Sequence, residues 1–556
     1  MKYYIFITRL VWGVFFFVFL QACGDKEESE PPVSVFTVDP EFVTLSVGES
    51  CQLVARLNGV ALNGDEVRWE ANTNLVSVDN TGKVTAVAYN EFISGIKVSA
   101  YTHNGLYAAS NIVINQNYSY IFRLVLKDKG TTGFSLSRPE EFLSVSAVEK
   151  RRKRNIPIAG SDLPLSEEYL AQIEKVGGKI VSRSKWLQTV CVQSDDPNIA
   201  DEYMKLPFVE DVVMVWRGNK EPAESESLSE RYFSRNAARF SAGDYGKALV
   251  NISIHNGQVL HDLGYTGEGI DIAVIDAGFI GLPDNPALND IHIKGARSFI
   301  YGKSDPYADD NHGVWVTSCM ATNRPGYFIG TAPGASYWLL RSEDMTGDCP
   351  VEEDYWAAAV EYADSVGADI VNTSLYYITY DPPFTSHKYE EMDGKTALAT
   401  RAANMAASKG MLIVCCTGND GSWVGTPADS PDVLTVGSVD KNGEIGSFTA
   451  YGITVDGRMK PDIVSLGQSA YTIGPDGTVG PRSGTSYASP ILCGLAACLW
   501  QAYPRLTNRQ LSDILKRSAD RYGSPQLPYG YGIPDIRKAI ELIREISPDD
   551  NLQSLK

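Results

Sequence analysis

The feature that most limits the fold of this chain is an apolar run at residues 270–275. It follows a glycine-rich turn, is broken only by Asp271, and ends at Asp276. A run of this kind is typical of a strand buried on both faces of a parallel sheet. In open α/β sheets, ligand-facing residues lie at the carboxyl ends of such strands, so Asp276 is a candidate functional residue. The alternative interpretation is that Asp276 only forms a turn.

A histidine further along the chain comes at the start of a predicted helix. His312 is one of only six histidines, and it precedes Gly313 and an apolar segment at residues 314–321. The segment predicts a helix that begins close to the histidine. Taken alone, a histidine in this position is more often structural than catalytic, and His312 stands out by its order among the other motifs.

The third element is the stretch Ser-Gly-Thr-Ser-Tyr-Ala-Ser-Pro at residues 483–490, followed by an apolar helical segment at residues 491–500. A serine at the start of a helix lies beside unpaired backbone N–H groups and the positive end of the helix dipole, which help to hold an oxyanion. Ser486 is therefore a candidate nucleophile.

Together the three elements resemble the subtilisin family, which has an Asp at a strand end, a His-Gly pair and Gly-Thr-Ser-x-Ala-Ser-Pro in that order. The resemblance implies that Ser486 is the nucleophile and His312 its general base. It implies that Asp276 orients the imidazole and stabilises its charged form. The expected activity is a serine endopeptidase that hydrolyses protein and peptide substrates through an acyl-enzyme on Ser486.

The resemblance extends to the surroundings of the triad. It implies that Asn419 donates to the oxyanion together with the backbone N–H of Ser486. The residues that it implies for substrate binding are Ser374, Leu375, Tyr376, Thr417 and Gly418. The chain departs from the family at Val314, at Tyr487 after the nucleophile, and at Tyr376, where the family has glycine. The last departure leaves the shape of the S1 pocket open.

Composition restricts cofactors and partners. The net charge is −19 with a pI near 4.9, which argues against nucleic acid as a partner.

The nine cysteines are too sparse for a disulfide scaffold and form no CxxC or Cys/His cluster, so we predict buried thiols and no metal ligands. The family resemblance implies structural calcium as the one cofactor to consider, but no dense Asp/Asn loop identifies a site.

Residues 1–22 have the pattern of a signal peptide, with an apolar run too short to span a bilayer. The run ends in Leu-Gln-Ala-Cys, which resembles a bacterial lipobox and implies lipid attachment at Cys23. Residues 23–33 are an acidic tether whose start is similar to the surface-export signal of Bacteroidetes lipoproteins. We expect an outer-membrane lipoprotein that faces the cell surface or the periplasm. The alternative is an ordinary signal peptide with an incidental cysteine.

Residues 34–116 alternate apolar and polar side chains in about seven short runs between turn signals, which predicts a β-sandwich. The segment resembles the bacterial Ig-like group 2 domain. It is either a spacer or a binding module for a glycan or a cell-surface partner.

Residues 117–220 predict an α+β domain with an order close to βαββαβ, including a helix at residues 139–154 that ends in a basic run. We interpret this run as a solvated helix face, and the alternative is a binding patch. The domain resembles the propeptide of Bacteroidetes subtilisins, which implies that it inhibits the enzyme and lays its C-terminus in the cleft. The alternative is a permanent domain. Residues 221–244 are a polar linker, and an autoproteolytic cut is expected between Trp216 and Asp244.

The predicted fold class is therefore α/β: a subtilisin-like parallel sheet flanked by helices, preceded by the propeptide-like domain and the Ig-like sandwich. The peptidase domain is expected at residues 245–546, with a tail at 547–556. The rival function is a non-catalytic surface adhesin that uses the Ig-like domain, but the presence of all three triad residues argues against it.

Overall fold

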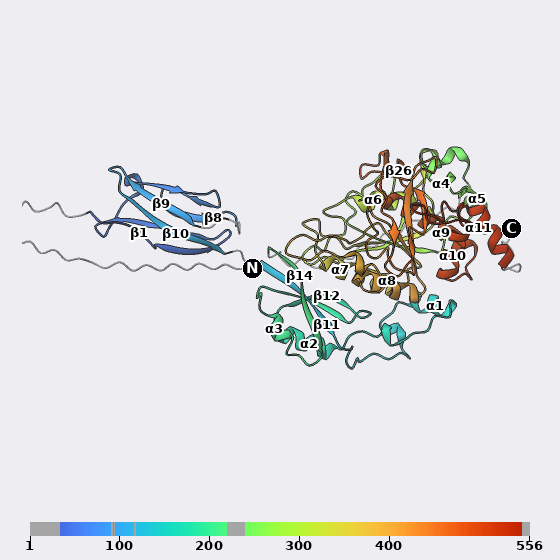
Figure 1. Ribbon diagram of the computed structural model, residues 1–556, viewed down its shortest axis with the longest axis horizontal. Coiled ribbons are helices and arrows are strands. Elements are labelled where there is room, and N and C mark those ends of the chain that lie inside the picture. Colours follow the sequence, from blue (N-terminus) through green and yellow to red (C-terminus); the bar gives the residue numbers. More distant parts are fainter. Residues whose placement is uncertain (1–33, 90–92, 94, 116–117, 220–239, 547–556) are drawn as a thin grey trace, which may run out of the picture. The chain divides into compact units, whose positions relative to one another are not determined.

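The structure is a computed structural model that describes residues 34–89, 93, 95–115, 118–219 and 240–546. The chain divides into two compact units, Met1–Asn117 and Tyr118–Lys556 (Figure 1). The signal peptide, Cys23, the tether, most of the linker and the C-terminal tail, as predicted above, lie outside the described residues. The domain boundaries given above stay predictions.

The first unit is built from short strands that enclose one apolar core. Sheet β2-β10-β9-β6, in which β2 runs parallel to β10, is accompanied by sheets β1-β4-β5 and β3-β8-β7. Its strands are β1 (Phe36–Asp39), β2 (Phe42–Ser46), β3 (Ser50–Gln52), β4 (Val54–Leu57), β5 (Val60–Ala61), β6 (Val67–Ala71), β7 (Val76–Val78), β8 (Lys83–Ala86), β9 (Ile96–Thr102) and β10 (Tyr107–Asn115). Strands β3 and β4 are separated by Leu53, which is buried and whose N–H donates to the carbonyl oxygen of Gly82. The sandwich thus has more and shorter strands than predicted.

The second unit begins with a four-stranded antiparallel sheet in the order β12-β13-β11-β14. The strands are β11 (Tyr118–Leu126), β12 (Lys179–Ser184), β13 (Thr189–Ser194) and β14 (Val209–Asn219). Helices α2 (Glu167–Val176) and α3 (Ala200–Tyr203) cover one face of this sheet.

The helix predicted at residues 139–154 is interrupted. A 3₁₀ turn at Pro139–Glu141 is separated from α1 (Val145–Lys153) by residues 142–144. The hydroxyl of Ser144 accepts a hydrogen bond from the N–H of Ala147 at 3.1 Å. Serine competes for backbone groups and favours this N-cap position, so α1 starts there.

The predicted solvated helix face is wrong. Of the basic run at the end of α1, Lys150, Arg151 and Arg154 form ion pairs with buried aspartates, and only Arg152 and Lys153 are exposed. Burying a cation is costly unless it is paired, so these three side chains belong to an interface.

The rest of the unit is organised around a seven-stranded sheet in the order β16-β19-β15-β20-β21-β22-β25, parallel throughout. Its strands are β15 (Asp271–Asp276), β16 (His292–Ser298), β19 (Ser336–Arg341), β20 (Ile370–Thr373), β21 (Leu412–Cys416), β22 (Val433–Val439) and β25 (Ile463–Leu466). The two-stranded ribbons are β17 (Asn323–Arg324) with β18 (Phe328–Ile329), β23 (Gly452–Ile453) with β24 (Met459–Lys460), and β26 (Ala470–Ile473) with β27 (Val479–Arg482).

Helices cover both faces of the large sheet (Figure 1). Alternate residues of β15 divide between two cores: Ile272 and Val274 pack with α6 and α9, and Ala273 and Ile275 pack with α7 and α8. The helices are α4 (Leu249–Ser253), α5 (Gln258–Asp262), α6 (His312–Ala321), α7 (Val351–Val366), α8 (Leu398–Ser408), α9 (Thr485–Ala502), α10 (Asn508–Ser518) and α11 (Ile536–Ile546). This arrangement is the predicted α/β class, because a parallel sheet needs both faces covered.

Candidate active site

Asp276 and His312 form a hydrogen-bonded pair at the carboxyl end of β15. Asp276 ends the strand and is fully buried, and Nδ1 of His312, the first residue of α6, lies 2.7 Å from its Oδ1. The N–H of Ala277 donates to the same oxygen at 2.8 Å. The backbone N–H of His312 donates to Asp310 at 2.6 Å. These contacts fix the ring with Nδ1 toward Asp276 and Nε2 on its opposite side.

The charge of Asp276 decides the protonation of His312. Burial lowers the pKa of the imidazole, but the charge and hydrogen bond of Asp276 outweigh it and, with Asp310, raise the pKa to about 9. The site therefore stabilises an imidazolium, which is the form a histidine takes after it accepts a proton from a hydroxyl.

Ser486 is the second residue of α9. The first turn of this helix is bound by a side chain of β20 and by one from the residue that follows β20. Pro490 lies four residues further on and has no N–H, so the carbonyl oxygen of Ser486 lacks the donor that this position normally supplies in a helix. The hydroxyl of Ser374 donates to that oxygen at 2.9 Å. Ser489 donates to Oδ1 of Asn372 on β20 at 2.8 Å. Asn372 and Ser489 were not singled out from the sequence, although a polar residue within an apolar strand could have indicated Asn372.

The side chain of Asn419 is oriented by Thr485, the first residue of α9. The N–H and the hydroxyl of Thr485 both donate to Oδ1 of Asn419, at 2.8 and 2.9 Å. Because the amide oxygen is used in this way, the NH₂ group is left for another acceptor. Together with the backbone N–H of Ser486 it supplies two donors at the start of α9, as an oxyanion site requires.

Six of the predicted site residues line one cleft of about 480 Å³. Its lining includes His312, Ser374, Leu375, Tyr376, Asn419 and Ser486. Two predicted substrate-binding residues do not line it: Thr417 is fully buried, and Gly418 lies against the ring of Tyr376, which is 3.0 Å from where a Cβ on Gly418 would be. The Tyr376 hydroxyl also accepts from the N–H of Asn419 at 3.4 Å. The large ring therefore covers the backbone that glycine would leave open.

The cleft is acidic, a property that was not predicted. Its lining includes Asp310, Glu343, Asp344, Asp348, Glu352 and Asp381. Among the described residues, Asp344 alone of these six forms an ion pair, with Lys303 at 2.7 Å. Burial raises the pKa of Glu343, and burial together with the charge of Glu343 raises the pKa of Glu352. The density of acidic residues between positions 343 and 354 could have signalled this lining.

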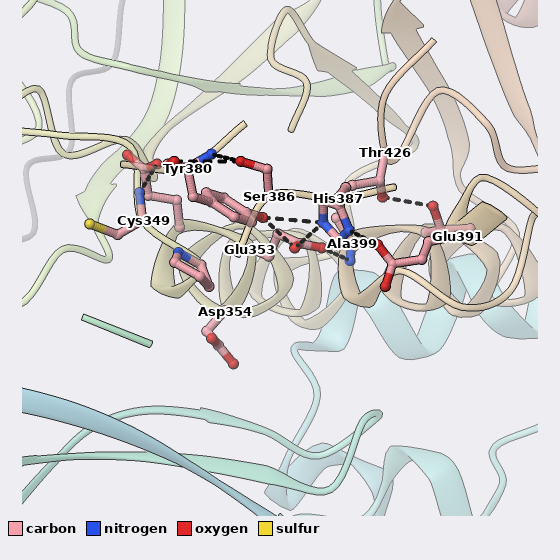
Figure 2. A network of polar contacts seen from close by, with 12 residues as sticks. Cys349, Glu353, Asp354, Tyr380, Ser386, His387, Glu391, Ala399 and Thr426 are labelled. Carbon is pink, nitrogen blue, oxygen red and sulfur yellow. Dashed lines mark hydrogen bonds and ion pairs between the residues drawn. The ribbon is translucent and has the colours of Figure 1, made fainter. Parts of the chain in front are cut away.

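The segment that follows the substrate wall is held by a polar network around Glu353 of α7 (Figure 2). Glu353 accepts from the hydroxyl of Tyr380 at 2.5 Å, from Nε2 of His387 at 2.8 Å and from the N–H of Ala399 at 2.8 Å. Nδ1 of His387 lies 3.0 Å from Glu391. Burial lowers the pKa of His387, but the two carboxylates outweigh it and raise the pKa to about 9. A charged imidazolium thus fastens this segment to α7.

Within the described ranges, no group of three or more His, Cys, Asp or Glu side chains is placed to hold a metal ion. The eight cysteines of these ranges are thiols, seven of them buried and Cys51 half-buried. No helix among the described residues is both long and apolar enough to cross a membrane.

Three parts of the chain match models of known families. Residues 267–533 match the subtilase family, residues 122–230 the peptidase S8 propeptide domain of Bacteroidota, and residues 32–92 the bacterial Ig-like domain of group 2. These matches confirm the three resemblances inferred from the sequence.

Curated relatives agree. Subtilisin NAT of Bacillus subtilis subsp. natto is 30% identical over 308 residues, 54% of this chain and 73% of its own length. Subtilisin J of Geobacillus stearothermophilus is 27% identical over 410 residues, 72% of this chain and 94% of its own. Among solved structures, the MycP3 protease from the type VII (ESX-3) secretion system has a TM-score of 0.44 at 25% identity, covering 57% of this chain and 93% of that one. The chain belongs to the subtilase family of serine endopeptidases.

Proposed function

We propose that this serine endopeptidase uses Ser486 as its nucleophile and acts as an exported, lipid-anchored enzyme. The observation that carries the catalytic part is the 2.7 Å hydrogen bond between His312 and Asp276, beside a cleft that Ser486 also lines.

In the proposed mechanism His312 takes the proton of the Ser486 hydroxyl as its oxygen attacks the carbonyl carbon of the scissile bond. Asp276 stabilises the imidazolium that forms. The negative charge moves to the carbonyl oxygen, which accepts from the amide of Asn419 and the N–H of Ser486. His312 then gives its proton to the leaving amine. Water then attacks the carbonyl carbon of the acyl-enzyme while His312 takes its proton. His312 returns a proton to the Ser486 oxygen as the acid product leaves.

The catalytic proposal is tested by labelling the purified enzyme with a fluorophosphonate, which reacts with activated serines. Wild type should be labelled and should hydrolyse casein, and Ser486→Ala should do neither. Ser483→Ala is a matched control, because Ser483 is an exposed serine of the same segment. A Ser486→Ala enzyme with a tenth of the wild-type activity would refute the role.

Export and anchoring rest on the lipobox-like sequence that ends in Cys23 and on the acidic tether after it. We place the enzyme in the outer membrane, facing the cell surface. Radiolabelled palmitate should enter wild type and not Cys23→Ala, and equal labelling of both would exclude the anchor. Protease shaving of intact cells separates a surface location, in which the enzyme is degraded, from a periplasmic one.

The match of residues 122–230 to a propeptide supports maturation by a cut in the following linker. Strand β14 extends to Asn219 and the next described element, a 3₁₀ turn, begins at Ala242, so the cut would fall between these residues. It requires Ser486. N-terminal sequencing of the active enzyme identifies the cut, and a single uncut chain with full activity would show that none occurs.

A further inference from the structure

The proposed mechanism limits where one residue of the substrate can lie, namely the residue that supplies the scissile carbonyl, called here the acyl-side residue. Its carbonyl oxygen accepts from the amide of Asn419 and the N–H of Ser486, and the leaving nitrogen faces His312, which protonates it. The remaining bond of the attacked carbon leads to the Cα of the acyl-side residue. This Cα therefore lies on the Asn419 side of the cleft, away from His312.

Tyr376 occupies this side of the cleft. It is the third residue after β20, and its hydroxyl accepts a hydrogen bond from the backbone N–H of Asn419 at 3.4 Å. Together with Ser374 and Leu375 from the same stretch, it belongs to the lining of the cleft. The ring thus lies next to the residue whose side chain is proposed to hold the oxyanion.

The ring of Tyr376 packs directly on the backbone of Gly418. A Cβ at Gly418 would lie 3.0 Å from Cε2 of the tyrosine and 3.2 Å from its Cδ2 and Cζ. The φ angle of Gly418 is +108°, a conformation that glycine adopts without strain and that other residues rarely adopt. No room is left between ring and backbone for a side chain of the substrate.

The backbone under the ring is held in place. The carbonyl oxygen of Gly418 accepts from the N–H of Ala450 at 3.1 Å and from the hydroxyl of Thr485 at 3.2 Å. Thr485 and Thr417 are fully buried, so the strand end that carries Gly418 is packed from behind. The space below the ring therefore does not widen by a retreat of the glycine.

The chain that carries the ring is fixed on both sides. Before it, the hydroxyl of Ser374 is bonded to the carbonyl oxygen of Ser486. After it, Tyr377 exchanges two backbone hydrogen bonds with Thr426, at 2.9 and 3.2 Å, and its hydroxyl donates to Glu343 at 2.6 Å. Only rotation of the Tyr376 side chain itself could clear the space, and this would break its packing on Gly418 and its contact with Asn419.

A ring in this position discriminates by size. Glycine, alanine and serine extend at most two heavy atoms from Cα, whereas leucine or phenylalanine at the acyl side would have to displace the ring. A wall that clashes with one substrate and not with another gives specificity without any new attraction. In a pocket of fixed shape, each misplaced methylene changes kcat/KM by about 10–200-fold.

We propose that Tyr376 closes the pocket for the acyl-side residue, so that the enzyme cleaves proteins and peptides after glycine, alanine or serine. The proposal rests on the proposed function, since it needs Ser486 and Asn419 in their catalytic roles. Tyr376 is a specificity-determining residue in this scheme. Its ring sets no limit on the residue that follows the scissile bond.

The linker before the peptidase domain offers a first check within the chain itself. Residues 220–239 contain alanine or serine at Ala223, Ser225, Ser227, Ser229, Ser234, Ala237 and Ala238. The Ser486-dependent maturation cut should follow one of these residues in the N-terminal sequence of the active enzyme. A cut after any larger residue would contradict the proposal.

The direct test is a digest of denatured casein by wild type, Tyr376→Gly and Tyr376→Phe, with every cut site identified by mass spectrometry. Wild type should cut after small residues, and Tyr376→Gly should also cut after leucine and phenylalanine. Tyr376→Phe is the matched control, because it keeps the ring and loses only the hydroxyl, and it should keep the wild-type pattern. If circular dichroism shows that Tyr376→Gly is unfolded, Tyr376→Ala replaces it.

Two peptides that differ only in alanine or phenylalanine at the acyl side give the magnitude. The ratio of their kcat/KM values should favour alanine at least about tenfold in wild type and Tyr376→Phe, and should fall at least about tenfold in Tyr376→Gly. Equal rates on both peptides in wild type, or an unchanged ratio in Tyr376→Gly, would overturn the proposal.

Failure of the proposed function appears in a different measurement. A fluorophosphonate with a small alkyl group presents no acyl-side side chain, so it should label Ser486 in wild type and in both Tyr376 variants. Wild type that is not labelled would refute the nucleophile. Wild type that is labelled but cuts mainly after large residues would refute only the role of Tyr376.

Discussion

The hydroxyl of Ser374 donates a 2.9 Å hydrogen bond to the carbonyl oxygen of Ser486, at the point where Pro490 deprives the helix of its own donor. A residue of the substrate wall thus supports the backbone of the proposed nucleophile. The two functions of the site, holding the substrate and placing the serine, share one side chain.

Ser374→Ala should therefore lower both stability and activity. The buried carbonyl oxygen loses its partner, which costs about 1–3 kcal/mol of unfolding free energy. A displaced Ser486 should reduce kcat by about tenfold or more. Thermal unfolding and peptide hydrolysis measure the two effects, with Ser483→Ala as control. Unchanged kcat would show that the hydrogen bond does not position Ser486.

Asn419→Ala should lower kcat by about 10²–10³, the loss known for subtilisin when its oxyanion donor is removed, with little change in KM. Thr485→Val keeps the backbone donor to Oδ1 of Asn419 and loses only the hydroxyl donor. Its loss in kcat should be smaller. Steady-state kinetics on one peptide rank the two variants, and equal kcat for Asn419→Ala and wild type would exclude the role.

The pH dependence of kcat/KM should follow the proton on His312. A base must be neutral to act, so activity is low below the pKa of His312 and rises as the proton is lost. Because Asp276 and Asp310 raise this pKa from 6.5 to about 9, the rising limb should lie at alkaline pH. Asp276→Asn should move the limb toward lower pH and reduce kcat strongly. A wild-type midpoint near 6.5 would contradict the assignment.

Asp348 and Asp381, two acidic residues in the lining of the cleft, predict a preference for basic substrates. Peptides that differ only in Lys, Gln or Glu next to the scissile bond should be hydrolysed in that order, with about tenfold in kcat/KM between Lys and Glu. The preference should shrink at high salt. Asp348→Asn with Asp381→Asn should weaken it, because both residues line the cleft. Equal rates for all three peptides would rule it out.

The network around His387 predicts a loss of stability at high pH. The pKa of His387 is raised from 6.5 to about 9 in the folded protein, so its contribution is complete below about pH 6.5 and is lost as pH rises through 9. Calorimetric unfolding between pH 6 and 9.5 should therefore show a decline, up to about 3 kcal/mol, that His387→Gln lacks. Parallel curves for the two proteins would exclude the network as its source.

Sequence patterns were sufficient where neighbours along the chain decide the outcome. The apolar run before Asp276 and the serine motif before the second apolar segment identified both the sheet and the end of it where the cleft lies. Sequence patterns failed to predict the environment of a residue where its partner lies far away in the chain. The basic run of α1 has the composition of a solvated face, and only its pairing with Asp271, 121 positions away, shows otherwise. The acidic lining and the Ser374 contact likewise depend on loops brought together by the sheet.

The ion pairs of α1 bear on the order in which the chain can fold. Strands β15 and β20 must pair in parallel although Asp271 and Asp369 are 98 positions apart, and closing such a loop costs about 4 kcal/mol of chain entropy. Sheets built from such distant neighbours assemble slowly. Lys150 contacts Asp271 at the start of β15 and Asp369 just before β20, and so stabilises this pairing once it has formed. A helix that precedes the peptidase domain in the chain thus supports the pairing of that domain's two central strands.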